Sequence, residues 1–230
     1  MYSRYAIYFT PPPGVFACLG AAWLGWDIKT GTTVHQPDYA GVDINKITQR
    51  PRKYGLHGTI RAPFRLADGQ TETGLANALD AFCSGREPFV LDGLTLSKIG
   101  RFLALTPQGN PSALVDLAGD AIENFERFRA PLSDDELARK NSPALTEKQR
   151  IYLNTFGYPH VKEYFRFHIT LTRPLSPDQS SSVSTLLLDY LQPACLRPFT
   201  IDSLSLCGEA SNGYFHEIDR FALGKATNSV

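Results

Sequence analysis

The sequence lacks an excess of charge of either sign, because 23 Lys and Arg residues balance 23 Asp and Glu residues among 230. A long nucleic-acid footprint requires a basic stripe that displaces counterions from the phosphates. The zero net charge therefore argues against a protein that binds extended nucleic acid. It leaves room for a small anionic substrate, since a few local Lys and Arg residues are enough to bind one.

Cysteine is scarce, and the four residues form no CxxC pair: Cys18, Cys83, Cys195 and Cys207. This spacing excludes the usual zinc motifs and makes a disulfide framework unusual for this chain length. Long hydrophobic runs are missing too, since none approaches the ~18 apolar residues of a membrane span. The N-terminus has no apolar stretch with a small-residue cleavage site. We therefore expect a reduced, soluble, cytoplasmic protein with no membrane partner and no cofactor.

What the sequence does contain is a pattern written twice. Residues 57–60 read His-Gly-Thr-Ile and residues 168–171 read His-Ile-Thr-Leu, and a proline follows six residues after each histidine. A second pair of similar segments, 88–96 and 198–206, begins with Pro-Phe in both copies. The histidines are 111 positions apart, and Asp92 and Asp202 of the second pair are 110 apart. This nearly constant offset indicates an internal repeat.

Each copy predicts the same order of elements: strand, helix, strand and strand. The first copy predicts strands at 53–61, 89–96 and 101–105 and a helix at 72–83. The second predicts strands at 162–173, 199–207 and 214–223 and a helix from 176 to 191. A strand over 4–10 and a helix over 16–26 come first, and helices over 111–125, 134–138 and 146–156 lie between the copies. Thr146 and Gln149 have the spacing of a helix capping box.

The repeat predicts an α+β fold with two pseudo-symmetric lobes, whose antiparallel sheets face a central groove and whose helices lie outside. We expect a single bilobal domain over residues 1–230. Lobe 1 is placed at about 1–127, a helical insert at about 132–156 and lobe 2 at about 157–230.

The two His-x-Thr pairs suit acid–base chemistry. Residues i and i+2 of a strand point to the same face, so His57 projects with Thr59, and His168 with Thr170. Imidazole titrates near ~6.5, so one ring can accept a proton while the other donates one. The threonine hydroxyls can donate hydrogen bonds to phosphate oxygens as charge builds up. The set suits cleavage of a phosphodiester, and its symmetry leaves open which histidine is the base.

Three further residues are candidates for substrate binding. Arg166 lies two positions before His168, and Tyr164 lies two before Arg166, so a regular strand places them on the same face. Lys53 stands four positions before His57. Arg166 and Lys53 would supply positive charge to a phosphate, and each is equally well explained as a solvent-exposed cation. The remaining histidines are expected to be surface or structural residues: His35, His160 and His216.

The repeated motifs resemble those of the two-histidine phosphoesterase superfamily, whose members carry two His-x-Thr/Ser-aliphatic motifs in two pseudo-symmetric α+β lobes. The whole chain is also similar to a bacterial family encoded beside phosphonate-degradation genes. The segments that carry this likeness are 4–8, 52–64, 157–159 and 165–172. The resemblance implies a metal-independent phosphodiesterase, with His57 and His168 as the acid–base pair and Thr59 and Thr170 on the phosphate.

The phosphonate association implies a substrate as well. Breakdown of phosphonates by carbon–phosphorus lyase yields 5-phosphoribosyl 1,2-cyclic phosphate, whose ring must then be opened. Two alternatives stay open: an RNA-end or 2′,3′-cyclic nucleotide phosphodiesterase, and a nucleotide or sugar-phosphate binding module without turnover. Zero net charge favours the small phosphorylated substrate, and two matched histidines count against binding alone. The sequence does not indicate the oligomeric state.

Overall fold

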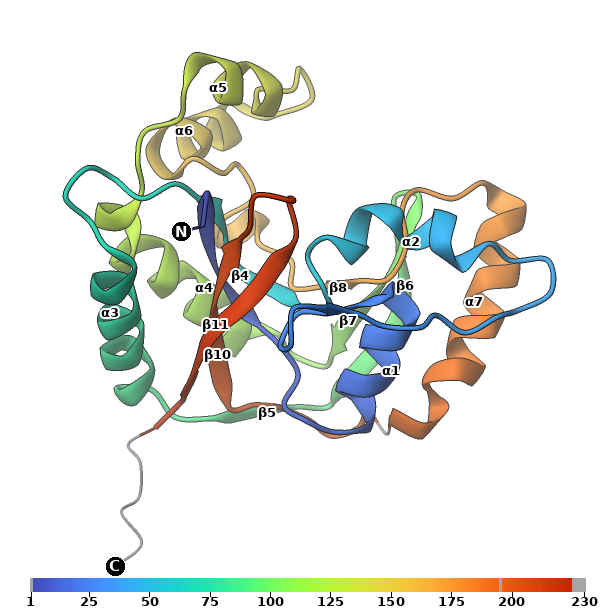
Figure 1. The fold of residues 1–230 in the computed structure, drawn as a ribbon. Coiled ribbons are helices and arrows are strands. Elements are labelled where there is room, and N and C mark those ends of the chain that lie inside the picture. The colour runs from blue at the N-terminus through green and yellow to red at the C-terminus, as the bar shows by residue number, and fades with distance from the viewer. Residues whose placement is uncertain (1, 195, 225–230) are drawn as a thin grey trace, which may run out of the picture.

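The computed structural model describes residues 2–194 and 196–224 and shows helices packed on an antiparallel sheet of seven strands (Figure 1). The spatial order of the strands is β11-β10-β1-β4-β8-β7-β6, and each neighbouring pair is antiparallel. The bounds are β1 Arg4–Phe9, β4 Gly58–Phe64, β6 Gly93–Ile99, β7 Phe102–Gln108, β8 Ile169–Thr170, β10 Ser203–Glu209 and β11 Phe215–Ala222. The predicted α+β class is confirmed.

The helices form two groups at the two ends of the sheet. At one end α3 packs on β10 and β11, and α4 packs on β4; at the other, α7 packs on β6 and β7 and contacts α1, which contacts α2 (Figure 1). Their bounds are α1 Val15–Leu24, α2 Ile44–Arg52, α3 Glu72–Ser84, α4 Ser112–Asn124, α5 Asp134–Lys140, α6 Glu147–Phe156 and α7 Pro177–Leu191. In the described part of the chain, no helix is long and apolar enough to cross a membrane.

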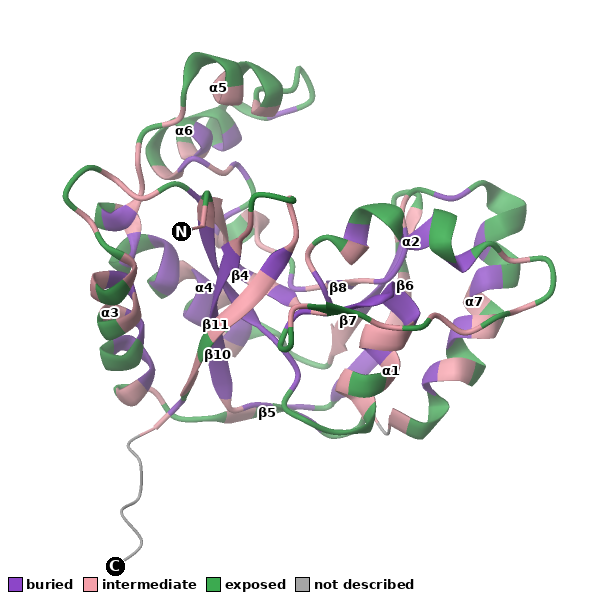
Figure 2. Cartoon of the chain, in the orientation of Figure 1, coloured by how far each residue is buried: buried purple, intermediate pink, exposed green. Residues whose placement is uncertain are grey.

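One core joins the two ends of the sheet. Ile60 of β4 and Ile169 of β8 belong to a single buried cluster with Leu79 of α3, Leu117 of α4 and Leu187 of α7. Figure 2 shows this burial along the strands and the inner helix faces, whereas α5 contains no buried residue. Neighbouring residues of a strand alternate between faces, and a second, smaller buried cluster that includes Tyr8, Trp26 and Phe215 lies apart from this core.

The equivalent strands of the two copies pair with each other, so the copies do not form two separate sheets. Gly58 of β4 is opposite Ile169 of β8. Val90 of β5 (Phe89–Leu91) is likewise opposite Thr200 of β9 (Phe199–Ile201), in a small separate sheet. Both pairs join equivalent positions of the two copies. An approximate twofold axis therefore passes between β4 and β8 and divides the large sheet into β11-β10-β1-β4 and β8-β7-β6.

The predicted division of the chain into lobe 1 at 1–127 and lobe 2 at 157–230 does not correspond to these two parts. β1 and β4 share one part with β10 and β11, whereas β6 and β7 share the other part with β8. The reason is an exchange, because each copy sends its last strands into the part that holds the other copy's motif strand. The correspondence also ends at the edge, where β11 lies outside β10 while its counterpart β7 lies next to β8.

Two predicted strands are shorter in the structure. The strand predicted over 53–61 begins only at Gly58, because the helix α2 extends to Arg52 just before it. At the start of α2, the Asp43 side chain accepts a hydrogen bond from the backbone N–H of Lys46. The strand predicted over 162–173 is reduced to Ile169–Thr170. It is preceded by a 3₁₀ turn over Lys162–Tyr164, and the left-handed φ of 53° at Lys162 interrupts an extended chain.

The helices predicted from the sequence agree with the structure, which adds α2. The helical insert contains α5 and α6, and the capping box predicted for Thr146 and Gln149 is formed at the start of α6. Ser176 caps α7 in the same way. Each of these helices begins where a hydroxyl side chain satisfies a backbone N–H that has no partner within the helix.

Candidate active site

The register of β4 and β8 brings the two His-x-Thr motifs together. Since Gly58 is opposite Ile169 in antiparallel pairing, His57 falls beside Thr170, and Thr59 beside His168. Gly58 and Ile169 are buried on the core face of the sheet. The four motif side chains therefore point to the other face, where they line one cavity of about 520 Å³, here called the motif cavity.

His57 is held by a backbone carbonyl and by an aromatic ring. Its Nδ1 lies 3.0 Å from the carbonyl oxygen of Gly55, and its Nε2 lies 3.2 Å from Oγ1 of Thr59. Because a carbonyl oxygen only accepts, the hydrogen is assigned to Nδ1. Nε2 of the neutral ring then carries a lone pair that accepts from the Thr59 hydroxyl. The imidazole also packs on Tyr8, with 4.0 Å between ring centroids.

His168 has the same attachment. Its Nδ1 lies 2.8 Å from the carbonyl oxygen of Arg166, which again is two residues before the histidine. The neighbouring aromatic ring is Phe102 of β7, at 5.9 Å between centroids. Both imidazoles are therefore fixed through Nδ1, and Nε2 of His57 contacts the Thr59 hydroxyl of the motif cavity.

The environment of His57 favours the neutral imidazole. Burial lowers the pKa of His57 to about 4; the hydrogen bond to Gly55 opposes this shift, and positive charge on His168 adds to it. The ring retains partial solvent exposure, but Tyr8 and Tyr54 pack against it. At neutral pH, His57 is thus able to accept a proton.

A second hollow of about 460 Å³ adjoins the motif cavity, and both are lined by Thr59, Tyr158 and His168. The second hollow also contains His160, which the sequence did not predict as a site residue. Gln149 accepts from the backbone N–H of Thr146 through Oε1, so its Nε2 donates to Nδ1 of His160 at 3.2 Å. The neutral His160 ring therefore carries its hydrogen on Nε2. The sequence signals near this residue were the capping box of α6 and the segment 157–159 directly before it.

Of the three substrate-binding residues predicted from strand spacing, Arg166 and Tyr164 line a hollow of the site, whereas Lys53 does not line the motif cavity. Arg166 and Tyr164 line the second hollow, and the Tyr164 hydroxyl lies 3.1 Å from Oγ1 of Thr146. Lys53 is exposed, follows α2, and accepts through its carbonyl from the backbone N–H of Phe215. It does not line the motif cavity. Its predicted place beside His57 required a strand that begins at residue 53, and β4 begins at Gly58.

Three cationic residues of the motif cavity had not been predicted: Arg50, Lys140 and Arg173. Arg50 belongs to α2, a helix that was not predicted from the sequence, and Lys140 belongs to the helical insert. Only Arg173 had a sequence signal, because it ends the strand predicted over 162–173, two positions after the second motif. In the described residues, no group of three or more His, Cys, Asp or Glu side chains is arranged to hold a metal ion.

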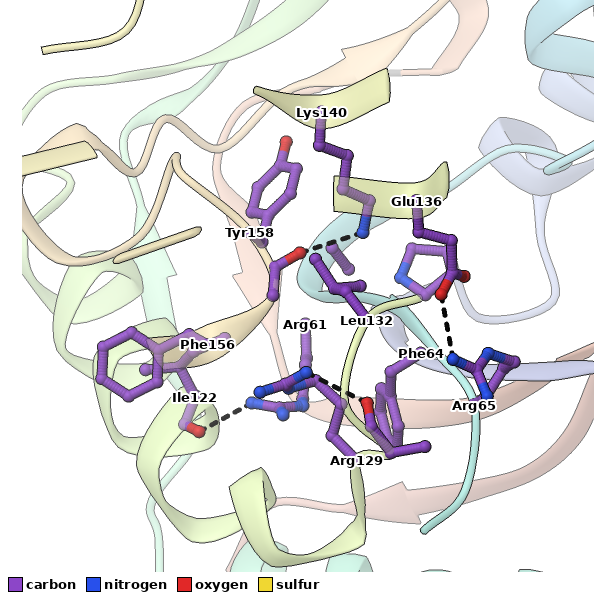
Figure 3. Close-up of a pocket in the computed structure, with 14 residues that line it drawn as sticks. Arg61, Phe64, Arg65, Ile122, Arg129, Leu132, Glu136, Lys140, Phe156 and Tyr158 are labelled. Atoms are coloured by element: carbon purple, nitrogen blue, oxygen red, sulfur yellow. Dashed lines mark hydrogen bonds and ion pairs between the residues drawn. The ribbon is translucent and has the colours of Figure 1, made fainter. Parts of the chain in front are cut away.

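Figure 3 shows where the helical insert packs against the rest of the molecule. Nζ of Lys140 donates to the carbonyl of Gly157 at 2.9 Å, and Arg65 pairs with Glu136 of α5 at 2.9 Å. These residues surround a space of only about 10 Å³, so the joint is closely packed. Burial lowers the pKa of Lys140. Because Lys140 lines both this joint and the motif cavity, the insert contributes one cationic side chain to the site.

Comparison with known proteins matches the chain to one family model and to two curated relatives. Residues 59–216 match the family model described as "Protein of unknown function (DUF1045)". Both curated relatives are named "Ribose 1,5-bisphosphate phosphokinase PhnN". The one from Janthinobacterium sp. (strain Marseille) is 32% identical over 219 residues, covering 92% of this chain and 48% of the relative. The one from Laribacter hongkongensis (strain HLHK9) is 34% identical over 214 residues, covering 91% and 49%. The chain thus spans about half the length of these relatives.

Solved structures with a similar course of the chain are distant in sequence. E. coli LigT complexed with 3′-AMP has a TM-score of 0.48 and 16% identity, covering 97% of this chain and 99% of that chain. A structure described as a phosphoesterase has a TM-score of 0.45 and 17% identity, with the same coverage. TT0787 of Thermus thermophilus has a TM-score of 0.46 and 14% identity, covering 96% and 99%. Values this low do not establish a shared activity or ligand.

Proposed function

This chain belongs to the DUF1045 family, and we propose that it is a phosphodiesterase that opens a small cyclic phosphate. Two histidines act as general acid and base, without a metal ion. One observation carries the proposal: His57 and His168 are fixed alike through Nδ1 to the carbonyl two residues before, and both line the motif cavity with Thr59 and Thr170.

His57 is the base in this mechanism and His168 is the acid. His57 is neutral at pH 7 because burial lowers its pKa to about 4, and a bound phosphate raises the pKa of an adjacent imidazole. Its Nε2 takes a proton from water as the water oxygen bonds to phosphorus. The bond from phosphorus to the ring oxygen breaks, and His168 gives that oxygen a proton from Nε2. The product is a phosphomonoester, and proton exchange with solvent restores both rings.

The threonines stabilise the negative charge that develops on the phosphate oxygens. Thr59 and Thr170 line the motif cavity beside the two imidazoles, so their hydroxyls can donate to the non-bridging oxygens. The Thr59 hydroxyl now donates to Nε2 of His57, and it turns to the phosphate when substrate enters. A donor of this kind contributes most in the transition state, where the negative charge is largest.

The proposed substrate is a ribose cyclic phosphate, in particular 5-phosphoribosyl 1,2-cyclic phosphate from phosphonate degradation. Support comes from the likeness of segments 4–8 and 52–64 to a phosphonate-associated family. The curated relatives, which this chain matches over half their length, carry a name that refers to a ribose bisphosphate. The motif cavity, at about 520 Å³, lies in the range of small-molecule sites.

A substrate comparison tests the proposal. The purified protein is incubated with 5-phosphoribosyl 1,2-cyclic phosphate, with 2′,3′-cyclic nucleotides and with RNA carrying 2′,5′ linkages, and phosphorus NMR follows the products. We expect ring opening of the ribose cyclic phosphate to be fastest. Preferred hydrolysis of the nucleotide or RNA would point to the alternative enzyme class. Tight binding without hydrolysis of any compound would identify a binding module and contradict the proposal.

A further inference from the structure

The motif cavity has an unbalanced charge. Its lining contains three cationic side chains, Arg50, Lys140 and Arg173, and no Asp or Glu of the described residues. A single phosphodiester carries one negative charge and would leave a positive excess. A phosphomonoester carries about 1.5–2 negative charges at pH 7. A ligand with one group of each kind would match the three cations.

Two of these cations belong to one wall of the cavity. The backbone N–H of Arg173 donates to the carbonyl of Ile47 at 2.7 Å, and its Nε donates to the carbonyl of Lys46 at 3.1 Å. Arg173 is thereby attached to α2. Arg50 lies three and four positions beyond these two acceptors, and residues at that spacing share a face of a helix. Arg50 and Arg173 therefore both line the cavity beside α2, whereas Lys140 enters from the helical insert.

The charges of this pair are not neutralised within the described part of the protein. The guanidinium of Arg173 donates to the carbonyls of Lys46 and Pro174, which are uncharged. The side chain of Arg50 makes no hydrogen bond or ion pair among the described residues. Arg52, two positions further along α2, is instead committed to Thr48 and to the carbonyl of Leu24. Arg50 thus has no visible structural task.

We propose that Arg50 and Arg173 bind a phosphomonoester group of the substrate, beside the phosphodiester that the histidines cleave. This inference rests on the proposed phosphodiesterase function and narrows its substrate class. The substrate is a cyclic phosphate that carries a second, terminal phosphate. Guanidinium groups suit this task because their planar fork can donate two parallel hydrogen bonds to a phosphate. A cyclic phosphate without the second group leaves these charges unpaired.

Two compounds that differ by a single phosphate test the inference: ribose 1,2-cyclic phosphate with and without the 5-phosphate. For the wild-type protein we expect kcat/KM to be about 100-fold higher with the 5-phosphate. Arg50→Ala should lose about 10-fold or more of this preference, which is the usual effect of losing a hydrogen bond to a charged group. Arg173→Lys keeps the positive charge but loses the planar fork of donors, and should lose part of the preference for the 5-phosphate. Lys98→Ala is the control, since Lys98 of β6 is an exposed cation outside the cavity lining.

Binding of ribose 5-phosphate, measured by calorimetry, separates this inference from the proposed function because it requires no turnover. The wild-type and Lys98→Ala proteins should bind it equally, and Arg50→Ala about 10-fold more weakly. Equal binding and an unchanged substrate preference in Arg50→Ala would overturn the phosphate site while leaving the phosphodiesterase intact. Weaker binding by Arg50→Ala, with no hydrolysis of any cyclic phosphate, would retain the anion site and remove the proposed function.

Discussion

Gly58 of β4 lies directly opposite Ile169 of β8, and each is the residue that follows the histidine of its motif. This pairing places the two motifs around an approximate twofold axis on one face of the sheet. Gly58 has no side chain, and a Cβ atom there would lie 2.2 Å from the ring of Phe167. Since Phe167 is buried in the core, the glycine lets the aromatic ring pack directly beneath the site.

Gly58→Ala should therefore destabilise the protein and lower its activity. The added methyl group meets a buried ring, and overpacking of this kind costs about 1–3 kcal/mol. Gly119→Ala in α4 is the matched control, because nothing lies within 4 Å of the added Cβ, and alanine favours the helix by about 0.5–1 kcal/mol. Denaturant unfolding measures both changes. Equal stability of the two variants would show that the contact with Phe167 is not a constraint.

The local features of this fold were predictable from the sequence, and the pairing of distant strands was not. Thr146 and Gln149 form their predicted capping box because the interaction spans only three residues. The exchange of β6–β7 and β10–β11 between the two parts of the sheet leaves no local mark, since either arrangement buries the same strand faces. The strand signal of segment 162–173 was overridden by the left-handed backbone of Lys162.

The four motif residues could be found because a repeat marks them, whereas the rest of the cavity carries no such mark. Arg50 and Lys140 reach the cavity from α2 and from the insert, and only the tertiary fold brings these elements to the motifs. His160 was expected to be structural, and its place beside His168 in the second hollow depends on how the insert packs.

The stability of the protein should fall in acid because of His57. An unfolded histidine titrates near ~6.5, whereas burial lowers the pKa of His57 to about 4. Between these values the unfolded chain binds the proton and the folded protein does not, so the free energy of unfolding decreases as the pH drops. The limit of this loss is about 3 kcal/mol. A His57→Gln variant should show a shallower decline between pH 7 and pH 4.5, and parallel declines would contradict the assignment.

Replacement of the threonines should slow the reaction without unfolding the protein. Thr59→Ala and Thr170→Ala each remove a hydroxyl that faces the motif cavity, and the loss of one such donor lowers kcat by about 10²–10³-fold. Thr→Ser keeps the hydroxyl and should retain most of the rate. Single-turnover kinetics with 5-phosphoribosyl 1,2-cyclic phosphate measure this effect. If Thr→Ala and Thr→Ser behave alike, the hydroxyls do not contact the phosphate.

The pH profile and the response to a chelator test the same mechanism from another side. One neutral and one protonated imidazole give a bell-shaped profile of kcat/KM, with two constants that belong to the pair. A chelator should leave the rate unchanged, because the histidines supply both proton transfers and the threonines stabilise the charge. Loss of activity in chelator that one divalent cation restores would instead indicate a metal-generated hydroxide.

The most direct test is the rate of ring opening in His57→Ala and His168→Ala. Both side chains line the motif cavity and neither belongs to the buried core, so both variants should fold, as circular dichroism would verify. We predict that each loses about 10²–10⁴-fold in kcat/KM for 5-phosphoribosyl 1,2-cyclic phosphate, the usual share of general acid–base catalysis. Turnover within a few-fold of wild type in either folded variant would contradict the two-histidine mechanism.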